Sequence, residues 1–130
     1  MRIHALSTGT VRVKESFLFA RTGVRRQLTL LMPSPWSAPL PIHVWVVEHG
    51  GRTILVDTGT TAAVRDIPFA RFDVPASQEL PALLAAAGLS LAAVDTTVLT
   101  HLHSDHMDGA PFVDGPVLVH DAELAFSATA

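Results

Sequence analysis

The feature that most constrains the fold is a pair of β-branched segments joined by two glycines. Residues 42–47 (IHVWVV) and 53–56 (TILV) have the composition of strands, and Gly50-Gly51 supplies a tight turn, so we expect a β-hairpin. The second strand runs into Asp57-Thr58-Gly59. A carboxylate that follows an apolar strand beside a glycine often serves as a functional group at the edge of a sheet. The alternative, an Asp that only hydrogen-bonds its own turn, is favoured when these residues are considered alone.

Strand patterns and helical patterns alternate along the rest of the chain, which predicts an α/β fold. Residues 77–87 place leucines on one helical face, with Pro81 in the first turn and Gly88 as the stop. We also expect an opening hairpin over residues 2–13, with its turn near residues 7–10. Strands are expected at 94–100 and 117–120, followed by a short final helix with Asp121 as its N-cap.

Two stretches carry little periodicity and are expected to be mostly loop. Residues 14–41 hold a basic segment and a proline-rich run, with one short strand expected near residues 27–31. Residues 60–75 hold Phe69 and Phe72. Together with Met107 these rings could wall a pocket, although apolar residues near a site more often belong to the core.

Composition is typical of one domain without a charged macromolecular partner. The 130 residues are 48% hydrophobic, with a net charge of -3 and no run of Lys or Arg, so we expect neither nucleic acid nor a membrane surface as partner. Cys is absent, which excludes disulfides and thiolate ligands. The N-terminus lacks the apolar segment of a secretory signal, and a cytoplasmic location is the expectation.

The strand at 94–100 leads directly into a dense cluster of metal-binding side chains, His101-Leu102-His103-Ser104-Asp105-His106. Three imidazoles and a carboxylate at these offsets should arise by chance in roughly one such chain in a thousand, which leaves an exposed His-rich loop as the weaker interpretation. On an extended segment His101 and His103 project to the same side and can reach one metal. Asp105 and His106 follow where the chain turns into a helix, and we expect them to point away from the first pair, where they suit a second metal or a base beside the first.

His and carboxylate ligands favour zinc, which lowers the pKa of bound water to about 7 and yields hydroxide at neutral pH. The sequence therefore predicts a zinc-dependent hydrolase, with Asp105 either as a ligand of the second ion or as the catalytic proton carrier. The other histidines stand alone in strands or turns and are not expected to be ligands; these are His4, His43, His49 and His120.

The H-x-H-x-D-H cluster, with Thr100 before it, Gly109 after it and Asp57-Thr58-Gly59 upstream, resembles the metallo-β-lactamase superfamily. The resemblance implies an αβ/βα sandwich with a mixed β-sheet, flanking helices and a site at the sheet edge. It implies that His101 and His103 bind a first zinc, and that Asp105 and His106 bind a second. Asp57 would then orient the ligands from behind.

Within that superfamily, the chain is most similar to the N-acyl-homoserine lactonases in three places: residues 39–42, the Gly50-Gly51 turn and residues 83–109. This similarity implies a lactone as the small-molecule substrate. Thioesters, as in hydroxyacylglutathione hydrolysis, and β-lactams are the alternatives, since each presents a carbonyl to the same hydroxide.

The resemblance reaches only the first half of the family fold, so the expectation is a single, truncated domain over residues 1–130. The family takes a third His, a bridging Asp and a final His from a second half, and we do not expect turnover from these residues in isolation. A catalytically incomplete fragment that only binds metal or dimerises is one alternative. Another is a half-domain completed by a homodimer or a partner chain that covers the exposed sheet face.

Overall fold

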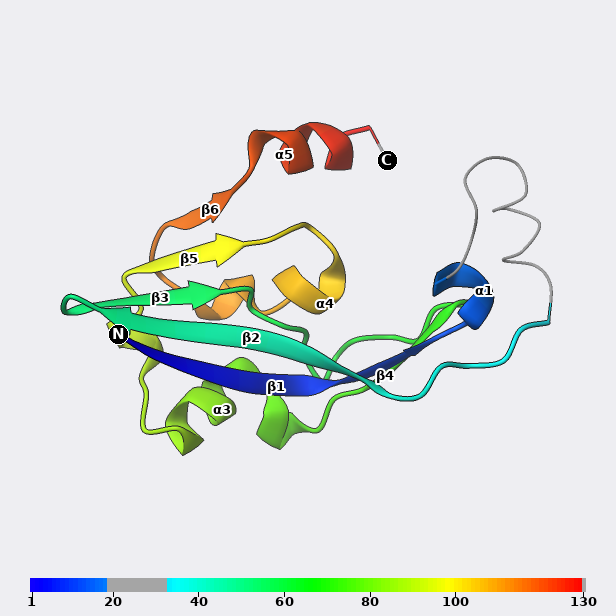
Figure 1. Ribbon diagram of the computed structural model, residues 1–130, viewed down its shortest axis with the longest axis horizontal. Coiled ribbons are helices and arrows are strands. Elements are labelled where there is room, and N and C mark those ends of the chain that lie inside the picture. Colours follow the sequence, from blue (N-terminus) through cyan, green and yellow to red (C-terminus); the bar gives the residue numbers. More distant parts are fainter. Residues whose placement is uncertain (19–32, 130) are drawn as a thin grey trace.

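The computed structural model describes residues 1–18 and 33–129, and in them a six-stranded mixed sheet with the strand order β4-β1-β2-β3-β5-β6 (Figure 1). The strands are β1 (Arg2–Val13), β2 (Leu40–His49), β3 (Arg52–Val56), β4 (Ala70–Asp73), β5 (Thr96–Leu99) and β6 (Val117–Val119). The helices are α1 (Glu15–Leu18), α3 (Leu80–Ala86), α4 (Ser104–Met107) and α5 (Asp121–Ser127), with 3-10 turns at Ala76–Gln78, Leu91–Ala93 and Ala110–Phe112.

The predicted β2–β3 hairpin is present and forms the middle of the sheet. Gly50 and Gly51 make its turn with φ of 58° and 76°, values that favour glycine. From β3 onward the pairing is parallel, with Ile54 opposite Thr96 and Thr97 opposite Val117. Parallel neighbours require a crossover, and residues 57–95, which include α3, provide it. The carboxyl ends of β3 and β5 therefore lie side by side at one edge of the sheet.

The predicted opening hairpin is wrong, because residues 2–13 form the single strand β1. The turn-like residues form a bulge instead, since Ser7 pairs with His43 and Thr10 with Pro41, which leaves one extra residue on β1. Long-range pairing with the ten-residue β2 outweighs the local turn preference. Beyond the bulge, the last residues of β1 also pair with β4.

Three other expectations need correction. Residues 60–75 are not entirely loop, because β4 lies within them. The α3 helix begins at Leu80, after a 3-10 turn, with Pro81 in its first turn and Gly88 after it as expected. His120 rather than Asp121 is the N-cap of α5, because its Nδ1 accepts a hydrogen bond from the Ala122 N–H at 3.1 Å. The strand expected near residues 27–31 lies outside the described residues.

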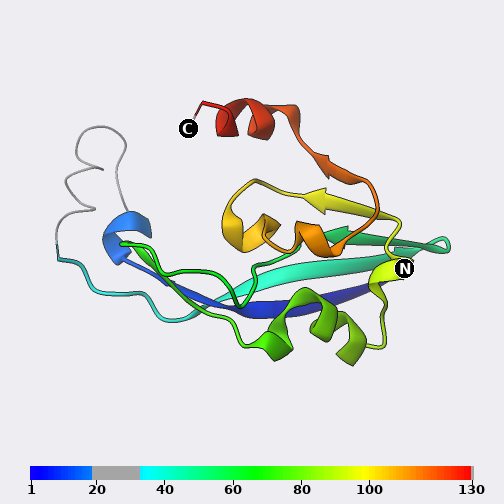
Figure 2. The same ribbon diagram turned by 180° about the vertical axis from the view of Figure 1, so that it is seen from behind.

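Helix α3 covers one face of the sheet in both views (Figures 1 and 2). The core cluster joins the two elements and consists of Val44, Val46, Leu55, Leu80 and Leu84. The opposite face leaves Trp45 42% exposed and Ile3 53% exposed. At the β6 edge, Leu118 and Phe126 are also exposed. No helix among the described residues has both the length and the apolar character to cross a membrane.

The loop after β3 packs against α4 at glycines. Gly59 has a φ of 68°, and a Cβ added there would overlap the side chain of Thr8. Its carbonyl accepts a hydrogen bond from the Gly109 N–H at 3.2 Å, and a Cβ on Gly109 would overlap the Thr58 carbonyl. Only glycine allows the backbones at residues 59 and 109 to come this close. The contact holds the Asp57-Thr58-Gly59 loop against the helix of the histidine cluster.

We predict that Gly59→Ala destabilises the fold more than Gly88→Ala does. Both positions have left-handed φ, which costs alanine about 1–2 kcal/mol, but nothing lies within 4 Å of a Cβ at Gly88. At Gly59 the overlap with Thr8 adds about 1–3 kcal/mol. Urea unfolding of the two variants measures the difference, and equal losses of unfolding free energy would contradict the role of close packing at Gly59.

Candidate metal centre

The histidine cluster lies at the sheet edge where β3 and β5 end. His101 and His103 follow β5 in an extended segment, while Asp105 and His106 lie in the short helix α4. Asp57 follows β3 directly, so the parallel pairing of β3 and β5 brings it beside the cluster although it lies 49 residues from His106 in the sequence. The topology thus joins the two motifs that the sequence analysis identified.

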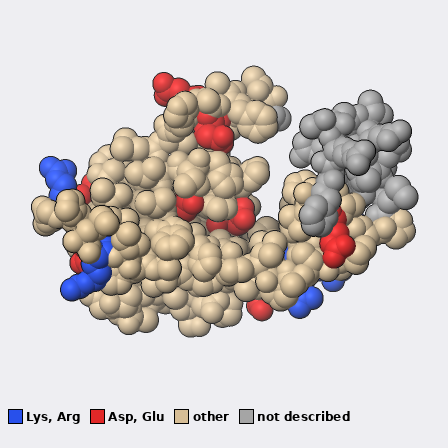
Figure 3. Space-filling view, in the orientation of Figure 1, with Lys and Arg blue, Asp and Glu red and all other residues tan. Residues whose placement is uncertain are grey.

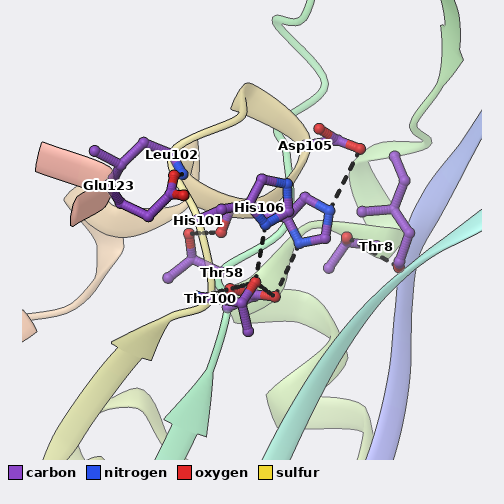
Figure 4. A network of polar contacts seen from close by, with 10 residues as sticks. Thr8, Thr58, Thr100, His101, Leu102, Asp105, His106 and Glu123 are labelled. Carbon is purple, nitrogen blue, oxygen red and sulfur yellow. Dashed lines mark hydrogen bonds and ion pairs between the residues drawn. The ribbon is translucent and has the colours of Figure 1, made fainter. Parts of the chain in front are cut away.

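Two of the three imidazole rings of the cluster, those of His101 and His106, lie side by side in Figure 4. The ring centroids of His101 and His103 are 4.7 Å apart, and those of His101 and His106 are 4.0 Å apart. The expectation that His106 points away from the first pair is therefore wrong. Helix α4 begins at Ser104, immediately after His103, and its first turn directs the His106 ring back toward His101.

Asp57 lies behind the rings and is 4% exposed. Its carboxylate accepts hydrogen bonds from the Thr100 N–H at 2.7 Å, from the Thr100 hydroxyl at 2.8 Å and from the His106 Nδ1–H at 2.8 Å. The residue has a φ of 59°, a left-handed conformation that is uncommon outside glycine. These contacts are more extensive than those of an Asp that only bonds its own turn.

Hydrogen bonding explains the two pKa shifts of this pair. The hydrogen bond from His106 to Asp57 raises the His106 pKa above 6.5, and this effect outweighs the burial that would lower it. Burial alone would raise the Asp57 pKa, but the hydrogen bonds from His106 and Thr100 are stronger together and lower it below 3.8. The pKa of His101 is lowered, first by burial and then by its two neighbouring histidines. Asp57 is therefore ionised at neutral pH.

Buried threonines form a polar layer beneath the rings that the sequence analysis missed. The Thr58 N–H and hydroxyl both donate to the His106 carbonyl, at 2.8 and 3.0 Å, and the Thr60 hydroxyl donates to Asp108 at 3.0 Å. Thr8 is also fully buried and donates to the Ile42 carbonyl at 3.3 Å. A run of Thr after Asp57 was the available sequence signal, because buried hydroxyls need partners.

The donor types fit zinc, but the arrangement supplies only part of a coordination shell. Imidazole nitrogens and carboxylate oxygens are ordinary zinc ligands, and His101, His103, Asp105 and His106 offer them at one edge of the sheet. Asp105 Oδ2 lies 3.6 Å from His106 Nε2. Within residues 1–18 and 33–129, however, no three His, Asp or Glu side chains are arranged to hold one ion together.

A pocket of about 370 Å³ adjoins the cluster on the side of α1 and β4. His103, Ser104 and Asp105 form its polar wall, and its apolar wall consists of Val11, Val13, Phe17, Ile67, Phe69, Ala70 and Phe72. Phe69 stacks on Phe17 with ring centroids 4.6 Å apart. Figure 3 shows a recess on this side of the molecule, with acidic side chains beside it. Met107, expected with Phe69 and Phe72, is 36% exposed and does not line the pocket.

The histidines that were not expected to be ligands lie apart from the cluster. His4 Nε2 is 2.9 Å from Glu48 Oε2, at the far end of β1 and β2. His120 caps α5, and His43 lies on β2 beside Trp45. Each of these three rings has a structural contact of its own, and the fourth histidine, His49, is the last residue of β2.

Comparison with known proteins assigns the family. The model of the metallo-β-lactamase superfamily matches residues 37–116, more than half of the chain. The chain belongs to the metallo-β-lactamase superfamily. The match begins before β2 and extends past the histidine cluster to the start of β6, so it includes both Asp57 and His106. A comparison with curated proteins finds no match.

Several solved structures have the same fold as this chain. An N-acyl homoserine lactone hydrolase with N-hexanoyl-L-homoserine at its catalytic metal centre is 18% identical, with a TM-score of 0.77 over 97% of this chain and 51% of its own. The dizinc quorum-quenching lactonase AidC is 21% identical, with a TM-score of 0.69 over 98% and 44%. A probable metal-dependent hydrolase from Staphylococcus aureus is 20% identical, with a TM-score of 0.74 over 99% and 50%. The chain thus spans about half the length of these three structures.

We predict that Asp57→Asn lowers the pKa of His106 toward 6.5, because the mutation removes the carboxylate whose hydrogen bond raises it. Asp105→Asn is the matched control and should lower the His106 pKa less, since Asp105 acts only through its charge. NMR titration of the His106 ring in the metal-free protein measures both shifts. An equal or larger effect of Asp105→Asn would contradict the assignment.

Proposed function

We propose that this chain carries the first half of the active site of a zinc-dependent hydrolase that opens lactones with an apolar acyl substituent. Membership of the metallo-β-lactamase superfamily, a family of metal-dependent hydrolases, supports the reaction class. The pocket of about 370 Å³ beside His103 and Asp105 is the observation that carries the substrate class. Two of the structural neighbours are described as N-acyl homoserine lactone hydrolases and another as a quorum-quenching lactonase, which agrees with this choice.

The chain's own residues have separate tasks in this proposal. His101, His103, Asp105 and His106 would hold zinc, which supplies Lewis-acid activation of a water molecule and of the substrate carbonyl. Phe69 and Phe72 would bind the acyl chain.

Asp105 lines both the cluster and the pocket, which suits it to move a proton. In lactone hydrolysis water adds to the carbonyl carbon, the ring C–O bond breaks and the ring oxygen takes up a proton. Asp105 would carry that proton from the water to the departing oxygen. A lactone carbonyl over His103 would place the acyl substituent along the apolar wall.

One observation favours a second candidate, a metal-binding or dimerising module without turnover. No three donors among the described residues converge on one point, so the chain offers an incomplete ligand set. A lactone-opening assay that follows proton release distinguishes the two candidates. Zinc-dependent turnover, by this chain alone or together with a chain that supplies the missing ligands, supports the hydrolase. Stoichiometric binding of zinc and lactone without turnover in either case supports the module. Thioesters and β-lactams serve as alternative substrates in the same assay.

We predict that zinc binding requires His103 and does not require His49. His103→Ala removes one imidazole from the cluster, and loss of a ligand should weaken zinc binding by at least the 10- to 100-fold typical of mutations in the groups that support ligands. His49→Ala removes an imidazole at the end of β2, away from the cluster. Equilibrium dialysis followed by elemental analysis measures bound zinc, and equal zinc content in the two variants would exclude the cluster as the metal site.

We predict that Phe72→Ala weakens binding of N-hexanoyl-homoserine lactone about tenfold, because the lost ring leaves about two methylenes of the acyl chain unburied. Unsubstituted homoserine lactone has no acyl chain and should bind both proteins alike. Phe112→Ala is the matched control, since Phe112 lies outside the pocket. Calorimetric titration measures these affinities, and a Phe72→Ala protein that binds both lactones as the unmodified chain does would exclude the pocket as the acyl site.

A further inference from the structure

The hydroxyl of Thr100 lies between the Asp57 carboxylate and the His101 ring. Figure 4 shows Thr100 beside the two imidazole rings of His101 and His106. Its Oγ1 is 2.8 Å from Asp57 Oδ2 and 3.0 Å from Asp57 Oδ1. On its other side the same Oγ1 is 3.0 Å from His101 Nδ1. All three distances are within hydrogen-bond range, so the hydroxyl connects a buried carboxylate to a ring of the histidine cluster.

The direction of these hydrogen bonds follows from the number of protons. A threonine hydroxyl carries one proton, and an ionised carboxylate can only accept. The hydroxyl proton therefore points to Asp57, and the Oγ1 lone pairs face His101. A neutral ring beside a hydroxyl that can only accept must donate, so the hydrogen of His101 lies on Nδ1. The Nε2 of His101 is then without hydrogen.

His106 reaches the same arrangement by a direct contact. Its Nδ1 donates to Asp57 Oδ2 at 2.8 Å, so in the neutral ring Nε2 is again the nitrogen without hydrogen. We propose that Thr100 is a positioning residue that transmits the charge of Asp57 to His101, so that one buried carboxylate selects the tautomer of both His101 and His106. Within the described part of the chain, no residue hydrogen-bonds the His103 ring in this way.

This selection prepares both rings for the same task. A histidine binds metal through a nitrogen that carries no hydrogen, and the hydrogen bond of the other nitrogen fixes which one that is. The two Nε2 atoms belong to rings whose centroids are 4.0 Å apart. The significance for catalysis depends on the proposed function, but the tautomers exist in the metal-free chain and can be measured without turnover.

The test is long-range proton–nitrogen NMR of the metal-free chain with nitrogen-labelled histidine, above the raised pKa of His106. We expect His101 and His106 in the unmodified chain to carry hydrogen on Nδ1. Thr100→Val keeps the size of the side chain but removes the hydroxyl, and we expect it to shift His101 toward a mixture of tautomers while His106 keeps its hydrogen on Nδ1. Thr100→Ser retains the hydroxyl and should restore the His101 signal.

Zinc affinity gives a second readout on the same variants. Thr100→Val should weaken zinc binding 10- to 100-fold, and Thr100→Ser should restore it, because supporting hydrogen bonds to a ligand typically have effects of this size. Three results would overturn the proposal: hydrogen on Nε2 of His101 in the unmodified chain, an unchanged His101 tautomer in Thr100→Val, or equal disturbance of His101, His103 and His106. A chain that opens no lactone leaves these NMR results intact, so failure of the proposed function is seen separately.

Discussion

The buried carboxylate of Asp57 is the contact on which the rest of the site depends. An ion that is 4% exposed would cost several kcal/mol without partners, and its left-handed backbone adds about 1–2 kcal/mol. Hydrogen bonds from Thr100 and His106 offset these costs. The donors come from the ends of β5 and from α4, while Asp57 follows β3. One side chain therefore ties three elements together and orients the rings at the same time.

The site is built in layers above the apolar core. Core residues such as Val44 and Leu55 fill the space between the sheet and α3. Toward the edge of the sheet the buried side chains become hydroxyls, with Thr58 and Thr60 bonded to the backbone and side chains of the α4 region. The imidazoles come last and are partly exposed. Because the hydroxyls of Thr58 and Thr60 have fixed partners, they hold the segment that carries His106 in place above the core.

The parts of the structure that could be predicted are those in which local sequence decides the conformation. The β2–β3 hairpin follows from β-branched residues around two glycines, and the metal-binding residue types are evident in the His101 to His106 segment. Their position relative to Asp57 came from family resemblance rather than from spacing. The existence of an edge site was therefore predictable, although its internal geometry was not.

The predictions that failed concern segments in which contacts between residues far apart in the sequence override the local conformational preference. Ser7 to Thr10 has turn-forming residues, yet pairing with β2 turns them into a bulge. Strand β4 is four residues long, so its alternation of apolar and polar residues is too short to predict a strand, and it forms by pairing with the end of β1. The direction of the His106 ring depends on where α4 begins, a boundary that sequence patterns locate poorly. Thr60 and Asp108 meet across 48 residues, so neither predicts the other.

The parallel pairing of β3 with β5 also links the site to the folding of the chain. Asp57 and His106 are 49 residues apart, and the crossover through α3 must close before they can meet. A parallel pair cannot form from a local turn, so the site is absent from any partly folded state in which β5 is undocked. An ion or ligand that needs the rings as Asp57 orients them binds only after β3 and β5 have paired. Its binding energy then adds directly to the stability of the parallel half of the sheet, and occupancy of the site reports completed folding.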